Sequence, residues 1–196
     1  MTSPNVALEA HLTQFQMDFT TFLKCRSKEM VIGGCMILTI LGCIINNDPK
    51  HILEIVGRVL NDMVSEGIIE EESVDYFNIP MYSPNEKEIR EVIEDDGSFW
   101  LHKLEVYEIA WDAGFSEAKG KTSNNTNIND DDDIDKHRRG EFVCGYMRAV
   151  MEPILTKQFG ESVMDDLFQR FTQKVIESIA NEHWQHVNLI VSLTKK

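Results

Sequence analysis

The sequence lacks the long apolar run that a membrane-spanning helix needs. Its longest such run, from Met36 to Ile45, is about ten residues long and includes Thr39 and Gly42. A helix that crosses a bilayer needs roughly 20 apolar residues. The first five residues, Met-Thr-Ser-Pro-Asn, show neither the basic nor the apolar segment of a secretory signal. We therefore expect a cytoplasmic protein with no membrane partner.

Basic residues are also scarce. The chain has 19 Lys and Arg against 33 Asp and Glu, a formal net charge of −14. Such a surface repels phosphate backbones, so the composition argues against nucleic acid as a partner.

Cysteines are few and are not arranged as metal ligands. The four residues (Cys25, Cys35, Cys43 and Cys144) show no C-x-x-C spacing. We expect reduced thiols, with Cys35 and Cys43 packing as small hydrophobic side chains.

Motifs of covalent catalysis and of nucleotide binding are missing. The chain contains no G-x-S-x-G nucleophile turn, no Walker loop and no G-x-G-x-x-G. The residues by themselves therefore identify no catalytic residue and no cofactor-binding residue.

What is present is an alternation of helical and strand patterns. Of the 196 residues, 42% are hydrophobic, enough for one sizeable core. A helix ending at Gly33-Gly34 and followed by a short apolar strand is typical of a parallel α/β sheet. The periodicity predicts helices over about 4–30, 50–66, 85–95, 142–154 and 162–179, the last opened by a capping box at Ser162–Asp165, and strands over 35–41, 98–111 and 187–193.

The run of asparagine and aspartate between positions 124 and 135 has no apolar period and one sign of charge, which predicts a disordered loop. We accordingly expect six segments. They are a helix and strand (1–49), a helical segment (50–97), a strand (98–112), the disordered acidic loop (113–140), two helices (141–183) and a final strand (184–196).

One stretch, Glu70 to Tyr82, is not explained by helix or strand periodicity. Asp75, the carbonyl of Phe77 and Asn78 bring three hard oxygen donors into four residues, which suits an ion such as Mg²⁺. The alternative is a local turn in which Asp75 and Asn78 bond nearby backbone amides. Spacing alone leaves both open.

Several motifs, in order along nearly the whole chain, resemble the SABATH family of plant carboxyl methyltransferases. They are QFQMDF (14–19), GGCMILT (33–39), NDMVSEGIIEEE (61–72), DYFNIPMY (75–82), GSF (97–99), RAVMEP (148–153), FGE (159–161) and NLIVSL (188–193). The resemblance implies transfer of a methyl group from S-adenosylmethionine to the carboxylate of a small organic acid; some relatives methylate xanthine nitrogens instead.

The resemblance also implies a fold. The match corresponds to the C-terminal part of the family's Rossmann-like sheet, strands five to seven, with a mostly helical cap that binds the acceptor. The resemblance implies that 1–49, 98–112 and 184–196 belong to the methyltransferase core. It implies that 50–97 is a helical cap with the acceptor and metal segment, and that 141–183 forms further cap helices. The family's glycine-rich loop for S-adenosylmethionine has no counterpart in these residues. We therefore expect a truncated enzyme that is inactive alone.

By position in the family's motifs, Asp75, Phe77 (through its carbonyl) and Asn78 match a Mg²⁺ site. Five residues match positions that line the acceptor pocket: Leu53, Tyr82, Met147, Val150 and His186. Leu53 stands where relatives often carry tryptophan, and His186 where they carry an aromatic residue. For Met147 and Val150, on one helical stripe, ordinary core packing is the competing interpretation.

Two other functions stay open. In the first, the chain is a non-catalytic module that pairs with a second copy, or with a full-length relative, through the unpaired edge of its first strand. Alternatively, it is a small acidic metal-binding protein centred on Asp75 and Asn78.

Overall fold

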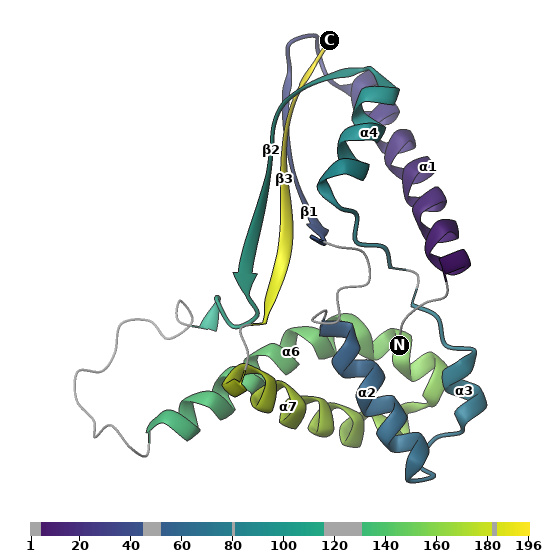
Figure 1. The fold of residues 1–196 in the computed structure, drawn as a ribbon, viewed down its shortest axis with the longest axis vertical. Coiled ribbons are helices and arrows are strands. Elements are labelled where there is room, and N and C mark those ends of the chain that lie inside the picture. Colours follow the sequence, from purple (N-terminus) through teal and green to yellow (C-terminus); the bar gives the residue numbers. More distant parts are fainter. Residues whose placement is uncertain (1–4, 45–51, 80, 116–130, 182–183) are drawn as a thin grey trace. The chain divides into compact units, whose positions relative to one another are not determined.

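The computed structural model describes residues 5–44, 52–79, 81–115, 131–181 and 184–196. They fall into two compact units, each described by itself (Figure 1). The sheet unit comprises residues 2–49, 79–109 and 186–196. The helical unit comprises residues 50–78 and 110–185.

The sheet unit is built on three strands: β1 (Cys35–Gly42), β2 (Phe99–Ala110) and β3 (Gln185–Lys195), in the order β1-β3-β2. β3 is antiparallel to β1, with Cys35 opposite Thr194 and Gly42 opposite Val187. At the other side, the Lys196 amide donates to the Ser98 carbonyl over 3.1 Å, as expected if β2 also runs against β3. The α/β class is confirmed. The expected parallel pairing is not seen, because the last strand inserts between the other two in the opposite direction.

Two helices cover one face of this sheet, α1 (Asn5–Glu29) and α4 (Glu86–Asp96) (Figure 1). Together they enclose the core of the unit with every second residue of β3, as the alternation over 187–193 predicts. α4, which we expected in the cap, packs here because its apolar stripe joins this core. The fully enclosed members are Phe19, Leu23, Ile89, Val92, Ile93, Phe99, Leu189, Val191 and Leu193.

The opposite face of the sheet is open in the part of the chain that the structure describes. Ile37 on β1 is 73% exposed and Trp100 on β2 is also exposed. Cys35 is exposed as well, so the expectations of a buried first strand and of a packed Cys35 are wrong; Cys43 is buried, as expected. An apolar run shows that a strand suits burial on both faces, but it does not supply the covering element.

Local backbone chemistry ends the helices where the sequence predicts. Gly33, after α1, and Gly67, after the helix at 52–65, adopt positive φ angles of 78° and 72°. The C-terminal turn of α1 is also capped from β3, since the Lys195 ammonium donates to the carbonyls of Ser27 and Met30.

The helical unit contains α2 (Ile52–Ser65), α3 (Glu71–Asp75), α6 (Asp131–Phe159), the 3₁₀ turn η1 (Glu161–Val163) and α7 (Met164–Asn181). α7 contacts both α2 and α6. Gly140 allows α6 and α7 to approach closely, because a Cβ there would lie 3.1 Å from Ile176 Cδ1 and closer still to Ile176 Cγ1.

Two expectations for this part of the chain fail. Residues 131–140 form the first turns of α6 rather than a loop, supported by ion pairs four residues apart such as Arg139–Asp135 (3.2 Å). Ser162 lies inside η1, whose N-cap is Gly160, so the expected capping box is not formed. The run at 124–130 lies outside the described residues.

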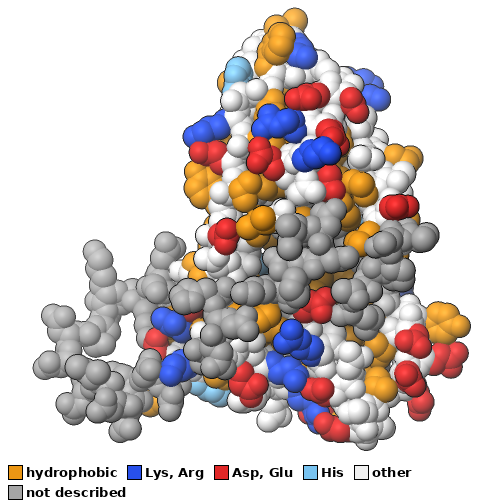
Figure 2. All heavy atoms as spheres, in the orientation of Figure 1, with side chains coloured by type: hydrophobic (Ala, Val, Ile, Leu, Met, Phe, Trp, Pro, Cys, Tyr) orange, Lys and Arg blue, Asp and Glu red, His pale blue; other side chains and the backbone are white. Residues whose placement is uncertain are grey.

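Charges are intermixed on the surface. In the view of Figure 2, acidic and basic side chains lie among one another over both units. Among the described helices, none combines the length and apolarity needed to cross a membrane.

Candidate functional site

The Asp75–Asn78 segment follows α3 and is held by the end of α6. The Phe77 ring packs edge-on against Phe159, with 5.1 Å between ring centroids. The Gln158 side-chain amide donates to the Ser73 carbonyl over 2.9 Å. These contacts hold the backbone on either side of Asp75.

The turn itself is a helix end rather than an aspartate-centred turn. The Tyr76 and Phe77 amides donate to the carbonyls of Glu72 and Val74, both over 3.1 Å. An Asx turn at Asp75 would use the Phe77 amide, which is already paired with a backbone oxygen. At Asp75 the backbone therefore forms a helix end and not an Asx turn.

The two side chains of the predicted ion site are open to solvent. Asp75 and Asn78 are exposed, and Phe77 is half-buried. Across the residues that the structure describes, no group of three or more His, Cys, Asp or Glu side chains could hold a metal. A site made from one carboxylate, one carbonyl and one amide stays a prediction.

Three of the residues that the resemblance assigns to the acceptor lie in the helical unit. Leu53 is half-buried in the first turn of α2. On α6, Met147 is 6% exposed, whereas Val150, one turn further on, is 63% exposed. Core packing therefore describes Met147 but not Val150, whose place in the buried stripe is taken by Met151.

Tyr82 lies in the sheet unit, in the chain that leads to α4. Its ring packs against Phe15 of α1, with 5.5 Å between centroids. Burial raises the pKa of the Tyr82 hydroxyl far above its usual range, and the neighbouring Glu88 carboxylate raises it further. The phenol is therefore neutral, and the Glu88 carboxylate is its neighbouring hydrogen-bond acceptor.

Glu88 is a buried carboxylate that sequence reasoning missed. It is 7% exposed and forms a capping box with Asn85. The backbone N–H of Asn85 donates to the Glu88 carboxylate over 2.9 Å, and the backbone N–H of Glu88 donates to Asn85 Oδ1 over 3.0 Å. The spacing Asn85-x-x-Glu88 is the signal that could have identified it.

His186 is the last of the five residues that the resemblance assigns to the acceptor. It is the second residue of β3 and is half-buried. Like Tyr82 it belongs to the sheet unit.

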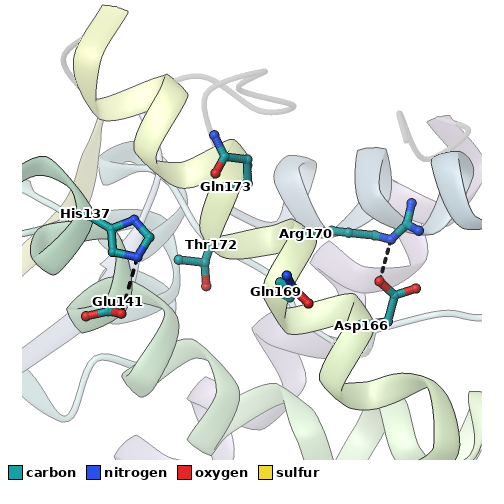
Figure 3. Close-up of a pocket in the computed structure, with 7 residues that line it drawn as sticks. All are labelled: His137, Glu141, Asp166, Gln169, Arg170, Thr172 and Gln173. Atoms are coloured by element: carbon teal, nitrogen blue, oxygen red, sulfur yellow. Dashed lines mark hydrogen bonds and ion pairs between the residues drawn. The ribbon is translucent and has the colours of Figure 1, made fainter. Parts of the chain in front are cut away.

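A surface depression lies on the helical unit, between α6 and α7. Figure 3 shows His137 and Glu141 on α6 facing a row of polar side chains along α7. Arg170, on this row, is already paired with Asp166 (2.8 Å) and with both carboxylate oxygens of Glu66 (2.7 and 2.8 Å). None of the predicted site residues lines this depression.

The Arg170 cluster joins α7 to α2 rather than forming a binding site. Lys174 adds a second link, to Asp62 over 2.7 Å. The guanidinium of Arg170 holds the pKa of Glu66 below its ordinary value.

Oxygen donors, apolar side chains and a neutral phenol are groups that bind and orient a small molecule. The predicted site residues include no nucleophile paired with a base, and the fold by itself does not specify a function.

Comparison with known proteins identifies the family. A family model described as "SAM dependent carboxyl methyltransferase" matches residues 1–196. The chain belongs to this family.

Individual relatives span different acceptors. Salicylate carboxymethyltransferase of Clarkia breweri is 38% identical over 199 residues, covering 100% of this chain and 52% of its own length. A benzoic acid/salicylic acid carboxyl methyltransferase of Petunia hybrida is 36% identical over 199 residues (99% and 50%). A 7-methylxanthine methyltransferase of Coffea canephora is 36% identical over 190 residues (96% and 47%).

Among solved structures, loganic acid methyltransferase with SAH superposes with a TM-score of 0.72 at 28% identity, covering 97% of this chain and 50% of that one. The chain spans about half the length of the relatives it matches.

Proposed function

We propose that this chain supplies the acceptor-binding half of a methyltransferase that moves a methyl group from S-adenosylmethionine to the carboxylate of a small organic acid. The observation that carries the proposal is the family match over all 196 residues. The relatives' acceptors named above include salicylic and benzoic acids.

The reaction asks little of acid–base groups. A carboxylate oxygen attacks the methyl carbon of the sulfonium, the C–S bond breaks, and its electron pair stays on sulfur. The carboxylate is already a nucleophile, so catalysis rests on alignment and on the exclusion of water. This chemistry agrees with a predicted site that lacks a nucleophile–base pair.

In this proposal Leu53, Met147 and Val150 give the acceptor apolar contacts. Tyr82, kept neutral by burial and by Glu88, contacts the acceptor through its ring and hydroxyl. His186 contributes a polar edge where relatives carry an aromatic ring.

Asp75, the Phe77 carbonyl and Asn78 would hold Mg²⁺. Oxygen donors at these positions suit this ion, which keeps several waters when it binds to few protein groups. The exposure of Asp75 and Asn78 leaves room for those waters. The ion would supply positive charge near this segment when bound.

The decisive experiment is a hybrid enzyme. The 196 residues replace the matching half of the Clarkia breweri enzyme, and methyl ester formation is measured with a panel of aromatic and terpenoid acids and a methylxanthine. We expect ester from at least one acid and none of the N-methylated xanthine. A folded hybrid that binds S-adenosylhomocysteine but methylates no carboxylate would refute the proposed reaction.

The 196-residue chain alone is the matched control. Because it spans half of its relatives, we propose that it is inactive alone and binds S-adenosylmethionine weakly. Calorimetric titration should give no saturable heat at micromolar protein. Tight binding would show that these residues contain a donor site after all.

The second candidate is a pairing module, favoured by the place of β1 at one edge of the described three-stranded sheet. The partner would be a second copy or a full-length relative that adds a strand at this edge. Gel filtration at increasing concentration, with and without the Clarkia breweri enzyme, tests it. Ile37→Lys should abolish any complex, and co-elution that is unaffected by this change would contradict pairing at β1.

A further inference from the structure

Three side chains form a row across the open face of the sheet. Cys35 on β1, Thr194 on β3 and His102 on β2 come from three different strands, and all three belong to the sheet unit. The Thr194 hydroxyl lies 3.5 Å from the Cys35 sulfur and 2.8 Å from His102 Nε2. The Cys35 thiol also lies 3.9 Å from the Gly33 carbonyl.

We propose that Cys35 is a thiol-exchange site, with Thr194 and His102 as its proton relay, that reacts with low-molecular-weight disulfides such as oxidised glutathione. This inference is independent of the proposed methyl transfer.

The order of the row is what carries the inference. A thiol is a poor nucleophile until it loses its proton. Cys35 can pass its proton to Thr194 Oγ1 while the Thr194 proton moves to His102 Nε2, provided that the imidazole enters the step neutral with its proton on Nδ1. The thiolate that results is hydrogen-bonded by the Thr194 hydroxyl, and the imidazolium lies one hydroxyl away.

One ammonium group lies on the face that carries the row. On this face the Lys196 ammonium lies over the Trp100 ring, 4.4 Å from its centroid, two residues after Thr194. Lys103 and Glu105 on β2 pair with each other over 2.7 Å and cancel. Lys195 points the other way, to the end of α1. The remaining titratable groups on the three strands are Tyr107, Glu108 and His186.

The other cysteines provide the contrast. Cys43 and Cys144 are buried, and burial raises the pKa of the Cys144 thiol. Cys25 is exposed on α1. Cys25 and Cys35 are both exposed, so a preference for one thiol reflects the groups around it, and the Thr194 and His102 variants assign that preference to the relay.

The step is a balanced exchange. The Cys35 sulfur attacks one sulfur of the disulfide, the S–S bond breaks, and the departing thiolate takes up the proton that the relay received. Cys35 is oxidised to a mixed disulfide, and one equivalent of small thiol is released.

The test compares two variants of the full 196-residue chain, each of which keeps one of the two exposed cysteines. Cys25→Ser leaves Cys35 as the exposed thiol, and Cys35→Ser leaves Cys25. Each is treated with excess oxidised glutathione, and the +305 Da adduct expected for one glutathionyl group is followed by intact-protein mass spectrometry. We expect Cys35 to react about tenfold faster, which is less than the roughly 10²–10⁴-fold that a positioned proton acceptor contributes in an enzyme site.

Relay variants in the Cys25→Ser background separate the mechanism from simple access. Thr194→Val and His102→Gln should each slow the reaction about tenfold, and Thr194→Ser should restore the rate. Equal reactivity of Cys25 and Cys35, or Thr194→Val reacting within twofold of its parent, would overturn the proposal.

Discussion

Gly140 offers the sharpest test of how α6 and α7 pack. In an ordinary helix interior, Gly→Ala stabilises by about 1 kcal/mol. At Gly140 the added methyl group would meet Ile176 Cγ1, an atom that is fixed close to the α7 backbone and cannot swing away as a side-chain tip can. Overpacking of this kind costs about 1–3 kcal/mol. We expect Gly140→Ala to be destabilising, by about 1 kcal/mol net.

Gly145, one and a half turns along the same helix, is the matched control. An added Cβ there meets nothing within 4 Å, so Gly145→Ala should stabilise by the propensity gain alone. The two variants should then differ by about 2 kcal/mol, or roughly 4–8 °C in melting temperature for a chain of this size. Thermal unfolding followed by circular dichroism measures the difference.

A double-mutant cycle assigns the effect to one contact. Ile176→Ala removes the atoms that the new methyl group would meet, so in that background Gly140→Ala should become stabilising. If Gly140→Ala stabilises the parent chain as much as Gly145→Ala does, the close approach of the two helices is wrong.

Three further predictions concern single contacts. Asn85→Ala removes the N-cap of α4 and should cost about 1 kcal/mol in urea unfolding, with Asn85→Ser regaining most of it; equal midpoints would show that the cap is idle. Lys195→Met removes the ammonium that caps α1 and should cost about 1 kcal/mol by the same measurement, against no detectable change for the exposed Lys24→Met. The lowered pKa of Glu66 means that its ion pair stabilises the fold fully above the unfolded value near 4.5 and is lost as pH falls through the lower folded value. The melting temperature of Arg170→Gln should therefore fall less steeply below pH 4.5 than that of the parent, and parallel curves would contradict this.

Much of the local structure was predictable because its causes lie within a few residues. The alternation over Val187–Leu193 predicts both a strand and its buried face, and both are observed. The glycines at 33 and 67 end helices because they alone adopt positive φ there without strain. The predicted stripe on α6 was off by one position beyond Met147, where Met151 rather than Val150 is buried.

The candidate site was less predictable. The resemblance selects residues by motif, so it could point to Tyr82 but not to the buried carboxylate beside it. Glu88 is buried because α4 packs on α1 and the sheet. The sequence of α4 is so highly charged that it does not indicate which of its carboxylates faces the core. The row of Cys35, Thr194 and His102 could not be predicted either, because it depends on which strands pack side by side.

The sequence by itself determined the family, the α/β class and the kinds and limits of most elements, because motif, periodicity and turn chemistry are local. Only the tertiary structure decided that β3 lies antiparallel between β1 and β2. That pairing brings Cys35 beside Thr194, 159 residues away, and Thr194 beside His102, 92 residues away. Such contacts depend on which strands become neighbours, and the free energy that selects the neighbours comes from burying β3 against α1 and α4 rather than from any local pattern.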